Sequence, residues 1–107
     1  MVSGSSGSLR IRLDDGPRVC YQRPSVDVLF RSLSMLDSRR VMAMILTGMG
    51  DDGADGLLAL KKAGAVTLAE DQSTCVVFGM PKEAIRRGGV SRVMPLSAIP
   101  AAIARGI

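Results

Sequence analysis

Three carboxylates lie in one short glycine-rich stretch, directly after an apolar run. Residues 41–46 have the composition of a buried strand, and Asp51, Asp52 and Asp55 follow within the next nine residues. In open α/β sheets, functional groups lie at the carboxyl ends of the strands. A carboxylate there could orient a catalytic histidine, yet the chain contains no histidine. The sequence therefore indicates part of an active site.

The same three carboxylates could instead bind a hard divalent cation. Magnesium and calcium need oxygen ligands that converge from several segments, whereas Asp51, Asp52 and Asp55 share one stretch without the spacing of an EF-hand loop. An acidic residue that opens a helix is stabilised by the positive end of the helix dipole. We therefore predict that Asp55 caps the following helix, and we predict no metal site and no cofactor.

Nucleophilic side chains give no clear catalytic candidate. Cys75 lies in an apolar run and has no histidine to activate it, so we predict that it is a core residue. No serine lies in a Gly-x-Ser-x-Gly elbow that follows a strand. We assign no serine a catalytic role.

Composition excludes several classes of protein. The chain has 107 residues, of which 47% are hydrophobic and 22% charged, which is typical of one globular domain. Three aromatic residues offer almost nothing for base stacking, so we expect no nucleic-acid partner. The net charge of +4 comes from dispersed Arg and Lys residues, which favour solvated helix ends over an anion-binding patch.

Cellular location follows from the cysteines and the apolar runs. Two cysteines are too few for a disulfide framework, and no stretch has the pattern of a secretory signal. The longest apolar run is far shorter than the ~20 residues that cross a bilayer. We expect a cytoplasmic protein without membrane insertion.

Turn signals divide the chain into alternating strands and helices. Residues 1–8 have the composition of a linker or flexible arm, and the domain is expected over residues 9–107. A short strand at 9–13 precedes a turn that could return through 19–21. Ser25 should cap a helix that ends near Ser38. Strands are then predicted at 41–47, 65–69 and 92–96, with a short β-prone run at 75–78.

Helices are predicted to separate these strands. One follows the glycine-rich bend and stops at Gly64, one has Pro81 in its first turn and ends at Gly88, and a terminal helix is capped by Ser97. Residues 70–73 are expected to form an acidic loop. Strands that alternate with helices imply parallel βαβ units. The predicted fold is α/β, a partial doubly wound (Rossmann-like) parallel sheet flanked by helices.

Three sequence blocks, in this order, closely resemble the CheB-type chemotaxis protein-glutamate methylesterases. They are Arg-Pro-Ser-Val-Asp-Val-Leu-Phe at 23–30, Thr-Gly-Met-Gly-Asp-Asp-Gly-Ala at 47–54, and Cys-Val-Val-Phe-Gly-Met-Pro-Lys-Glu-Ala-Ile at 75–85. The similarity runs from about Leu9 to the C-terminus. It matches only the second half of that family's catalytic domain.

The resemblance implies hydrolysis of glutamyl methyl esters, and deamidation of glutamines, on chemoreceptors by a serine, a histidine and an aspartate. It places the triad aspartate at Asp52, with Asp51 at a variable position, and suggests the backbone N–H of Met49 as a donor to the oxyanion. On residue type alone, the Met49 side chain would more often be core. The family's serine and histidine have no counterpart here, so the chain alone is expected to be inactive.

Two other functions remain open at this point. The chain could be a non-catalytic chemotaxis interaction module, or, less favourably, a receiver-like phosphoacceptor, for which only one strand end is acidic. The expected partners are a methyl-accepting chemoreceptor and either a second copy of the chain or the N-terminal half of the domain. A sheet that lacks its leading strands would expose an edge and an apolar strip suited to such pairing.

Overall fold

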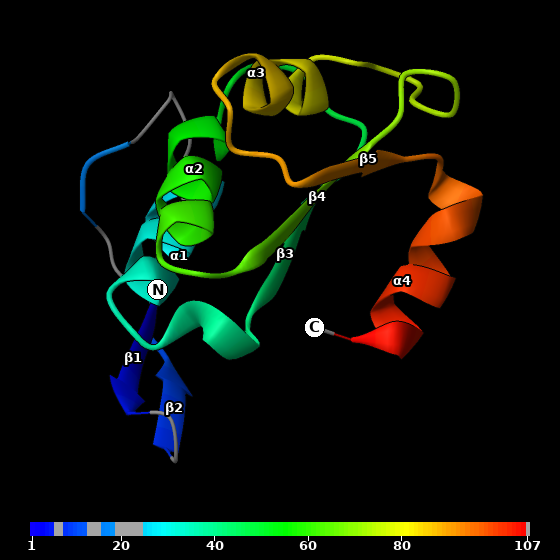
Figure 1. Ribbon diagram of the computed structural model, residues 1–107. Coiled ribbons are helices and arrows are strands. Elements are labelled where there is room, and N and C mark those ends of the chain that lie inside the picture. Colours follow the sequence, from blue (N-terminus) through cyan, green and yellow to red (C-terminus); the bar gives the residue numbers. More distant parts are fainter. Residues whose placement is uncertain (6–7, 13–15, 19–24, 107) are drawn as a thin grey trace.

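A three-stranded parallel sheet lies at the centre of the computed structural model, which describes residues 1–5, 8–12, 16–18 and 25–106 (Figure 1). The strands are β3 (Met42–Ile45), β4 (Val66–Glu70) and β5 (Arg92–Met94), in the order β3-β4-β5. Ile45 lies opposite Ala69, and Glu70 opposite Met94. The carboxyl ends of all three strands therefore meet at one edge, and the predicted α/β architecture is confirmed.

Helices flank this sheet. They are α1 (Val26–Ser34), α2 (Ala54–Lys62), α3 (Met80–Arg86) and α4 (Ile99–Arg105), with short 3₁₀ turns η1 (Ser38–Arg40) and η2 (Leu96–Ala98). In Figure 1, α1 and α2 pack together on one side of the sheet, and α4 lies on the other. Among the described residues, no helix is apolar over a length that would cross a bilayer.

The core lies between the sheet and the α1–α2 pair. Its largest fully buried apolar side chains are Leu57 and Leu60 of α2, whereas Leu68 of β4, also fully buried, lies on the opposite face of the sheet, in register with Met44. In β3, Ala43 and Ile45 are buried, whereas Met42 and Met44 on the opposite face are only half-buried. The sequence predicted a strand buried on both faces. The difference arises because α1 and α2 cover one face closely, and the other is less completely covered.

The first residues form structure where their composition predicted a flexible arm. Strand β1 (Val2–Ser5) pairs antiparallel with β2 (Ser8–Ile11). The Val2 N–H donates to Ser32 Oγ on α1 at 2.6 Å, so this hairpin contacts the domain. The strand expected near 9–13 is thus present, but its partner precedes it. The return strand expected at 19–21 lies outside the described residues, as does Arg23.

Three local predictions were wrong. Glu70, expected in a loop, is the last residue of β4 and is buried. The β-prone run at 75–78 is no strand and has a single bridge, between Gly48 and Phe78. Ser97 does not cap α4, whose N-cap is Ala98. The η2 turn already provides a backbone acceptor for the first N–H of that helix, since Ile99 N donates to Leu96 O.

Candidate functional site

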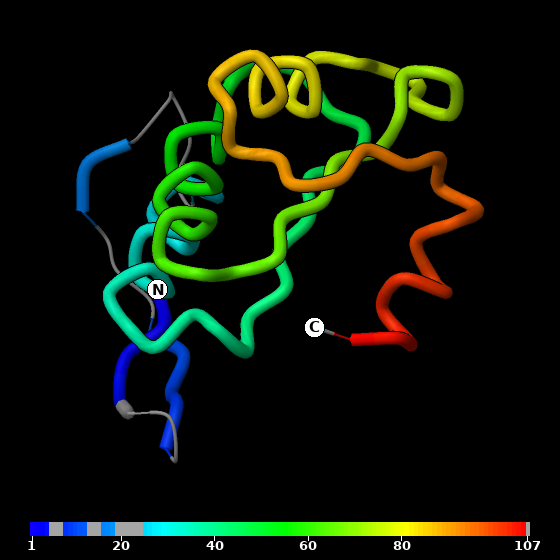
Figure 2. Tube along the Cα trace, in the orientation of Figure 1, coloured from blue at the N-terminus to red at the C-terminus, as the bar shows by residue number. Residues whose placement is uncertain are grey.

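The loop that follows β3, residues 47–53, lies against the start of α3 (Figure 2). The Gly48 N–H donates to Val77 O at 3.0 Å, and Gly48 O accepts from the N–H groups of Gly79 at 3.0 Å and Met80 at 2.8 Å. A Cβ atom at Gly79 would lie 2.7 Å from Gly48 O. This close approach requires glycine, which explains part of the 75–85 block.

These contacts fix the direction of the Met49 N–H. In a planar trans peptide, the carbonyl of one residue and the N–H of the next point in opposite directions. Because Gly48 O faces the α3 segment, the Met49 N–H faces away from it, and no described residue accepts from it. The Met49 side chain is 82% exposed, so a core role is excluded. The loop thus presents the backbone N–H of Met49 as a hydrogen-bond donor without a partner among the described residues.

Asp52 is buried at the N-terminus of α1, with 7% of its surface exposed. Its Oδ1 accepts from the Ser25 hydroxyl at 2.7 Å and from the Asp27 N–H at 3.0 Å, while its Oδ2 accepts from the Val26 N–H at 2.8 Å. A carboxylate offers about four acceptor positions. Three are therefore occupied, and one position, on Oδ2, remains available.

The N-terminus of α1 is capped by a carboxylate that lies just before α2, and the N-terminus of α2 is capped by a carboxylate of α1. Asp52, just before α2, accepts from the first N–H groups of α1, and Asp27 of α1 accepts from the Gly56 N–H in the first turn of α2. Unpaired N–H groups at a helix start favour negative charge. Arg31 Nε also donates to Asp27 Oδ2, at 2.7 Å. This reciprocal capping fixes the Asp52 carboxylate against α1.

The contacts of Ser25, Val26 and Asp27 to Asp52 were not predicted from the sequence. Ser25 was expected only as an N-cap, and the structure confirms that role through the bond from Val28 N to its Oγ at 3.4 Å. The only sequence signal was the position of this block within the family pattern. The contacts join residues 25 to 27 positions apart, which local patterning does not reveal.

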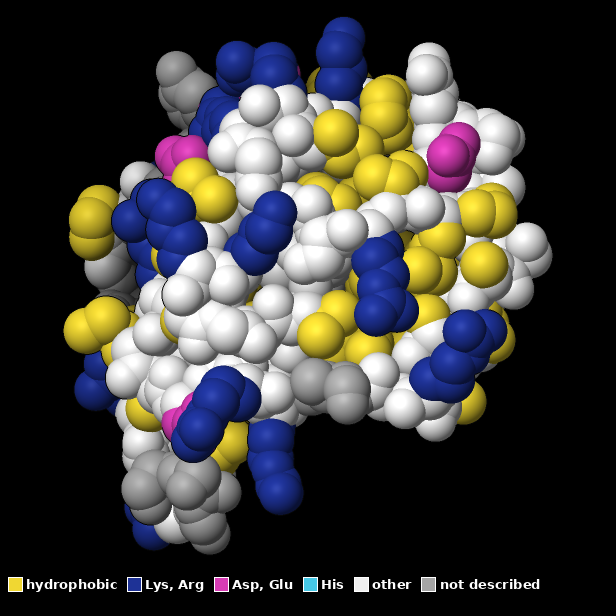
Figure 3. Space-filling model, viewed as in Figure 1, with side chains coloured by type: hydrophobic (Ala, Val, Ile, Leu, Met, Phe, Trp, Pro, Cys, Tyr) yellow, Lys and Arg dark blue, Asp and Glu magenta, His cyan; other side chains and the backbone are white. Residues whose placement is uncertain are grey.

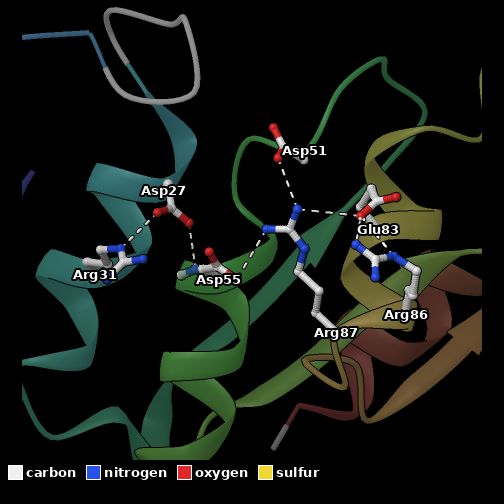
Figure 4. A network of polar contacts seen from close by, with 8 residues as sticks. Asp27, Arg31, Asp51, Asp55, Glu83, Arg86 and Arg87 are labelled. Carbon is white, nitrogen blue, oxygen red and sulfur yellow. Dashed lines mark hydrogen bonds and ion pairs between the residues drawn. The ribbon is translucent and has the colours of Figure 1, made fainter.

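Asp51 and Asp55 bind one guanidinium group (Figure 4). Arg87 Nη2 lies 2.9 Å from Asp51 Oδ2 and 3.5 Å from Glu83 Oε2, and Arg87 Nη1 lies 3.2 Å from Asp55 Oδ1. The hydrogen bond with Asp51 is the largest influence that raises the pKa of Arg87. Arg87 is 24% exposed on its side chain, so it is not the solvated helix end that its position after α3 predicted.

The three carboxylates therefore do not converge on one point. Asp52 faces α1, whereas Asp51 and Asp55 face Arg87. Among the described residues, no group of three or more acidic, histidine or cysteine side chains is arranged to hold a metal ion. Asp55 lies in the first turn of α2, but the N-cap is Gly53, so the prediction that Asp55 caps the helix was wrong in its position.

Cys75 is half-buried near the end of β4, with its Sγ 3.7 Å from Glu70 O. Burial, followed by the charge of Glu70, raises the pKa of its thiol. A thiol must lose its proton to act as a nucleophile. This environment agrees with the prediction that Cys75 is not a nucleophile, although the residue is less buried than a core position would be.

An open hollow of about 510 Å³ adjoins the Met49 loop. Its lining residues are Gly50, Asp51, Phe78, Gly79, Lys82 and Glu83. The hollow therefore lies on the α3 side of the loop, near the carboxyl edge of the sheet, where α/β domains bind ligands, whereas the Met49 N–H faces away from α3.

Comparison with known proteins identifies the family to which the chain belongs. The family model described as CheB methylesterase matches residues 1–103. The chain is 54% identical over 105 residues to a protein-glutamate methylesterase/protein-glutamine glutaminase of Anaeromyxobacter dehalogenans, covering 98% of the chain and 29% of that relative. It is 52% identical over 98 residues to the Escherichia coli protein of that name, covering 92% of the chain and 28% of that protein.

A solved structure agrees with the sequence comparisons. The crystal structure of the Thermotoga maritima CheB methylesterase catalytic domain superposes with a TM-score of 0.87 at 37% sequence identity. It matches 97% of this chain, which covers 55% of that structure. The chain thus spans less than a third of the length of these curated relatives and about half of a catalytic domain.

Proposed function

Because the chain belongs to the CheB methylesterase family, we propose that it contributes the orienting aspartate, Asp52, and an oxyanion donor, Met49 N–H, to the hydrolysis of glutamyl methyl esters and the deamidation of glutamines. The burial of Asp52, with one acceptor position left on Oδ2, carries this proposal. A carboxylate fixed in this way can accept one further N–H without moving.

Asp52 would accept the N–H of a histidine imidazole at Oδ2. That bond holds the imidazole in one tautomer, so that its other nitrogen can take the proton of a serine hydroxyl. The bonds from Ser25 and from the first N–H groups of α1 keep the Asp52 carboxylate from rotating. Asp52 thus orients the base and does not itself accept the proton.

The Met49 N–H would donate to the oxygen that becomes negative when the serine oxygen attacks the ester carbonyl. The protonated imidazole then gives its proton to the leaving oxygen, methanol departs, and water releases the glutamate from the serine. With a glutamine side chain the leaving group is ammonia. Backbone N–H groups that are fixed before reaction stabilise such an oxyanion strongly.

The serine and histidine come from outside these 107 residues in this proposal, since the chain contains no histidine and no serine in a Gly-x-Ser-x-Gly elbow that follows a strand. The uncovered part of the catalytic domain is a natural source, because the chain spans 55% of the Thermotoga maritima structure. The proposed substrate is a methyl-accepting chemoreceptor, and the proposed setting is the cytoplasm. The names of the relatives, which specify protein-glutamate methylesterase and protein-glutamine glutaminase, support this substrate class.

A comparison of two neighbouring aspartates tests the proposal. In a complete catalytic domain that contains this chain, Asp52→Asn should lower kcat by about 10⁴, the loss seen for the orienting aspartate of serine proteases. Asp51→Asn is the matched control, since it changes the adjacent carboxylate, which faces Arg87 instead of α1. A larger loss at Asp51 than at Asp52 would contradict the assignment. A non-catalytic binding module would show no turnover in any variant.

A further inference from the structure

We infer that Glu70 is a positioning residue for the proposed ester-hydrolysing site, because its buried carboxylate fixes the loop that presents the Met49 N–H. This inference rests on the proposed function. Glu70 is 1% exposed, and it ends β4 at the carboxyl edge of the sheet. The proposed mechanism gives it no chemical step.

Glu70 joins the ends of two strands where their backbone pairing stops. The last paired residues of β3 and β4 are Ile45 and Ala69. One residue further along β4, Glu70 Oε1 accepts from the Thr47 N–H at 2.9 Å. A side chain thus continues the connection between the strands into the start of the site loop.

The second carboxylate oxygen of Glu70 holds the loop after β4. Glu70 Oε2 accepts from the Thr74 hydroxyl at 2.9 Å, and Thr74 Oγ1 accepts from the Leu96 N–H, just beyond β5, at 3.0 Å. The ends of all three parallel strands are therefore tied to one carboxyl group.

Burial makes this arrangement resistant to displacement. Among the described residues, no Lys or Arg forms an ion pair with Glu70, so the Thr47 N–H and the Thr74 hydroxyl are its principal donors. A buried carboxylate that loses a donor has no compensating water. Movement of Thr47 away from β4 is therefore costly, which restrains the base of the loop.

The restraint reaches Met49 through two residues. Thr47 Oγ1 accepts from the Val77 N–H at 2.8 Å and lies 3.2 Å from Val77 O, to which it donates. Gly48 O is then held by the Gly79 and Met80 N–H groups. With Thr47 and Gly48 both fixed, the plane of the next peptide, and hence the direction of the Met49 N–H, is set.

Two substitutions at Glu70 distinguish the effect of its hydrogen bonds from the effect of its side-chain volume. In Glu70→Gln, the side-chain carbonyl can still accept from Thr47 N and the amide can donate to Thr74 Oγ1. In Glu70→Leu, both bonds are lost at similar size. We expect Leu to lower kcat of a complete domain about 10²-fold, as misplacement by about 1 Å does, with KM changed less than about twofold, whereas Gln keeps kcat within about threefold.

Amide hydrogen exchange in this chain provides a readout that does not depend on turnover. Glu70→Leu should speed exchange at Thr47 and shift the Met49 amide resonance, while Glu70→Gln leaves both close to wild type. Thr67→Val is the control, because Thr67 is a buried polar residue nearer the start of β4 and bonds to Ser91. It should lower stability without moving the Met49 amide.

A folded Glu70→Leu variant with wild-type kcat and an unchanged Met49 amide would overturn the inference. If that variant does not fold, Thr74→Val replaces it; this substitution removes the donor to Oε2 together with the acceptor of the Leu96 N–H and leaves the bond from Thr47 N in place. A loss of kcat of about tenfold in Thr74→Val would then support the inference, and no loss would overturn it. Failure of the proposed function would differ, since Asp52→Asn would then also leave turnover unchanged.

Discussion

The Ser25 hydroxyl donates to Asp52 Oδ1 across 2.7 Å, and Ser25 Oγ also accepts from the Val28 N–H within α1. One hydroxyl thus caps a helix and fixes the carboxylate proposed to orient the histidine. Stability and activity are therefore coupled at Ser25.

Replacement of Ser25 by alanine should weaken both properties. Loss of the N-cap is expected to lower the free energy of unfolding by ~1 kcal/mol. In a complete catalytic domain, kcat should also fall, because the Asp52 carboxylate loses one of its three restraints. Urea unfolding and initial rates measure the two effects. Ser25→Thr, which keeps the hydroxyl, is the control, and an equal loss of kcat in both variants would refute the role of the hydroxyl.

Arg87 should stabilise the site loop through Asp51. A double-mutant cycle with Arg87→Met and Asp51→Asn is expected to give a coupling free energy of up to ~1 kcal/mol, smaller at high salt, since the pair is only partly buried. Urea unfolding at low and high salt measures it. Arg86→Met is the matched control, because among the described residues Arg86 pairs with Glu83 and not with Asp51. Equal coupling of Asp51 to Arg86 would contradict the observed geometry.

Low pH should remove the contribution of Asp37 to the stability of the folded chain. Hydrogen bonds from the Arg39 side chain, then from its backbone N–H, lower the pKa of Asp37 to about 2. Because the folded pKa lies below the ordinary value of about 4, the contribution is present above pH 4 and is lost as the pH falls towards 2. Unfolding midpoints from pH 5 to pH 2 should show a shallower dependence for Asp37→Asn. An identical pH dependence would count against this ion pair.

Local chemistry explains which parts of the fold could be predicted. Gly64 follows α2 with a φ of +103°, the left-handed conformation that ends many helices, and Pro81 lies in the first turn of α3, as predicted. These features depend on neighbouring residues. The pairing of β1 with β2 was not predicted, because a Ser/Gly-rich stretch has no alternating pattern to reveal it.

Candidate site residues could be predicted from the sequence only where they lie in a recognisable motif. Asp52 and Met49 lie in the 47–54 block, so the resemblance made them candidates. The Arg87 bond to Asp51 spans 36 positions, and the Glu70 bond to Thr47 spans 23. Such contacts depend on how the sheet brings strand ends together. The sequence predicts Glu70 in a polar loop, because its donors, the Thr47 N–H and the Thr74 hydroxyl, come together only in the folded chain.

The isolated chain is expected to self-associate. The order β3-β4-β5 leaves β3 with one side unpaired among the described strands, and apolar side chains gather over the face that contains β5 and α4, where Val93, Leu96 and Ile103 are exposed (Figure 3). Exposed edges and apolar patches promote pairing between chains. Light scattering should show mass rising with concentration, and a folded monomer at every concentration would contradict this prediction.

Hydrolysis of a methylated chemoreceptor, by this chain alone and joined to the uncovered part of a catalytic domain, tests the central claim most directly. Release of methanol by the chain alone should equal the no-protein control, because Asp52 can only orient a histidine that another segment supplies. The joined domain should release methanol, and Asp52→Asn should abolish most of that rate. Turnover by the isolated chain, or a joined domain indifferent to Asp52→Asn, would contradict the account.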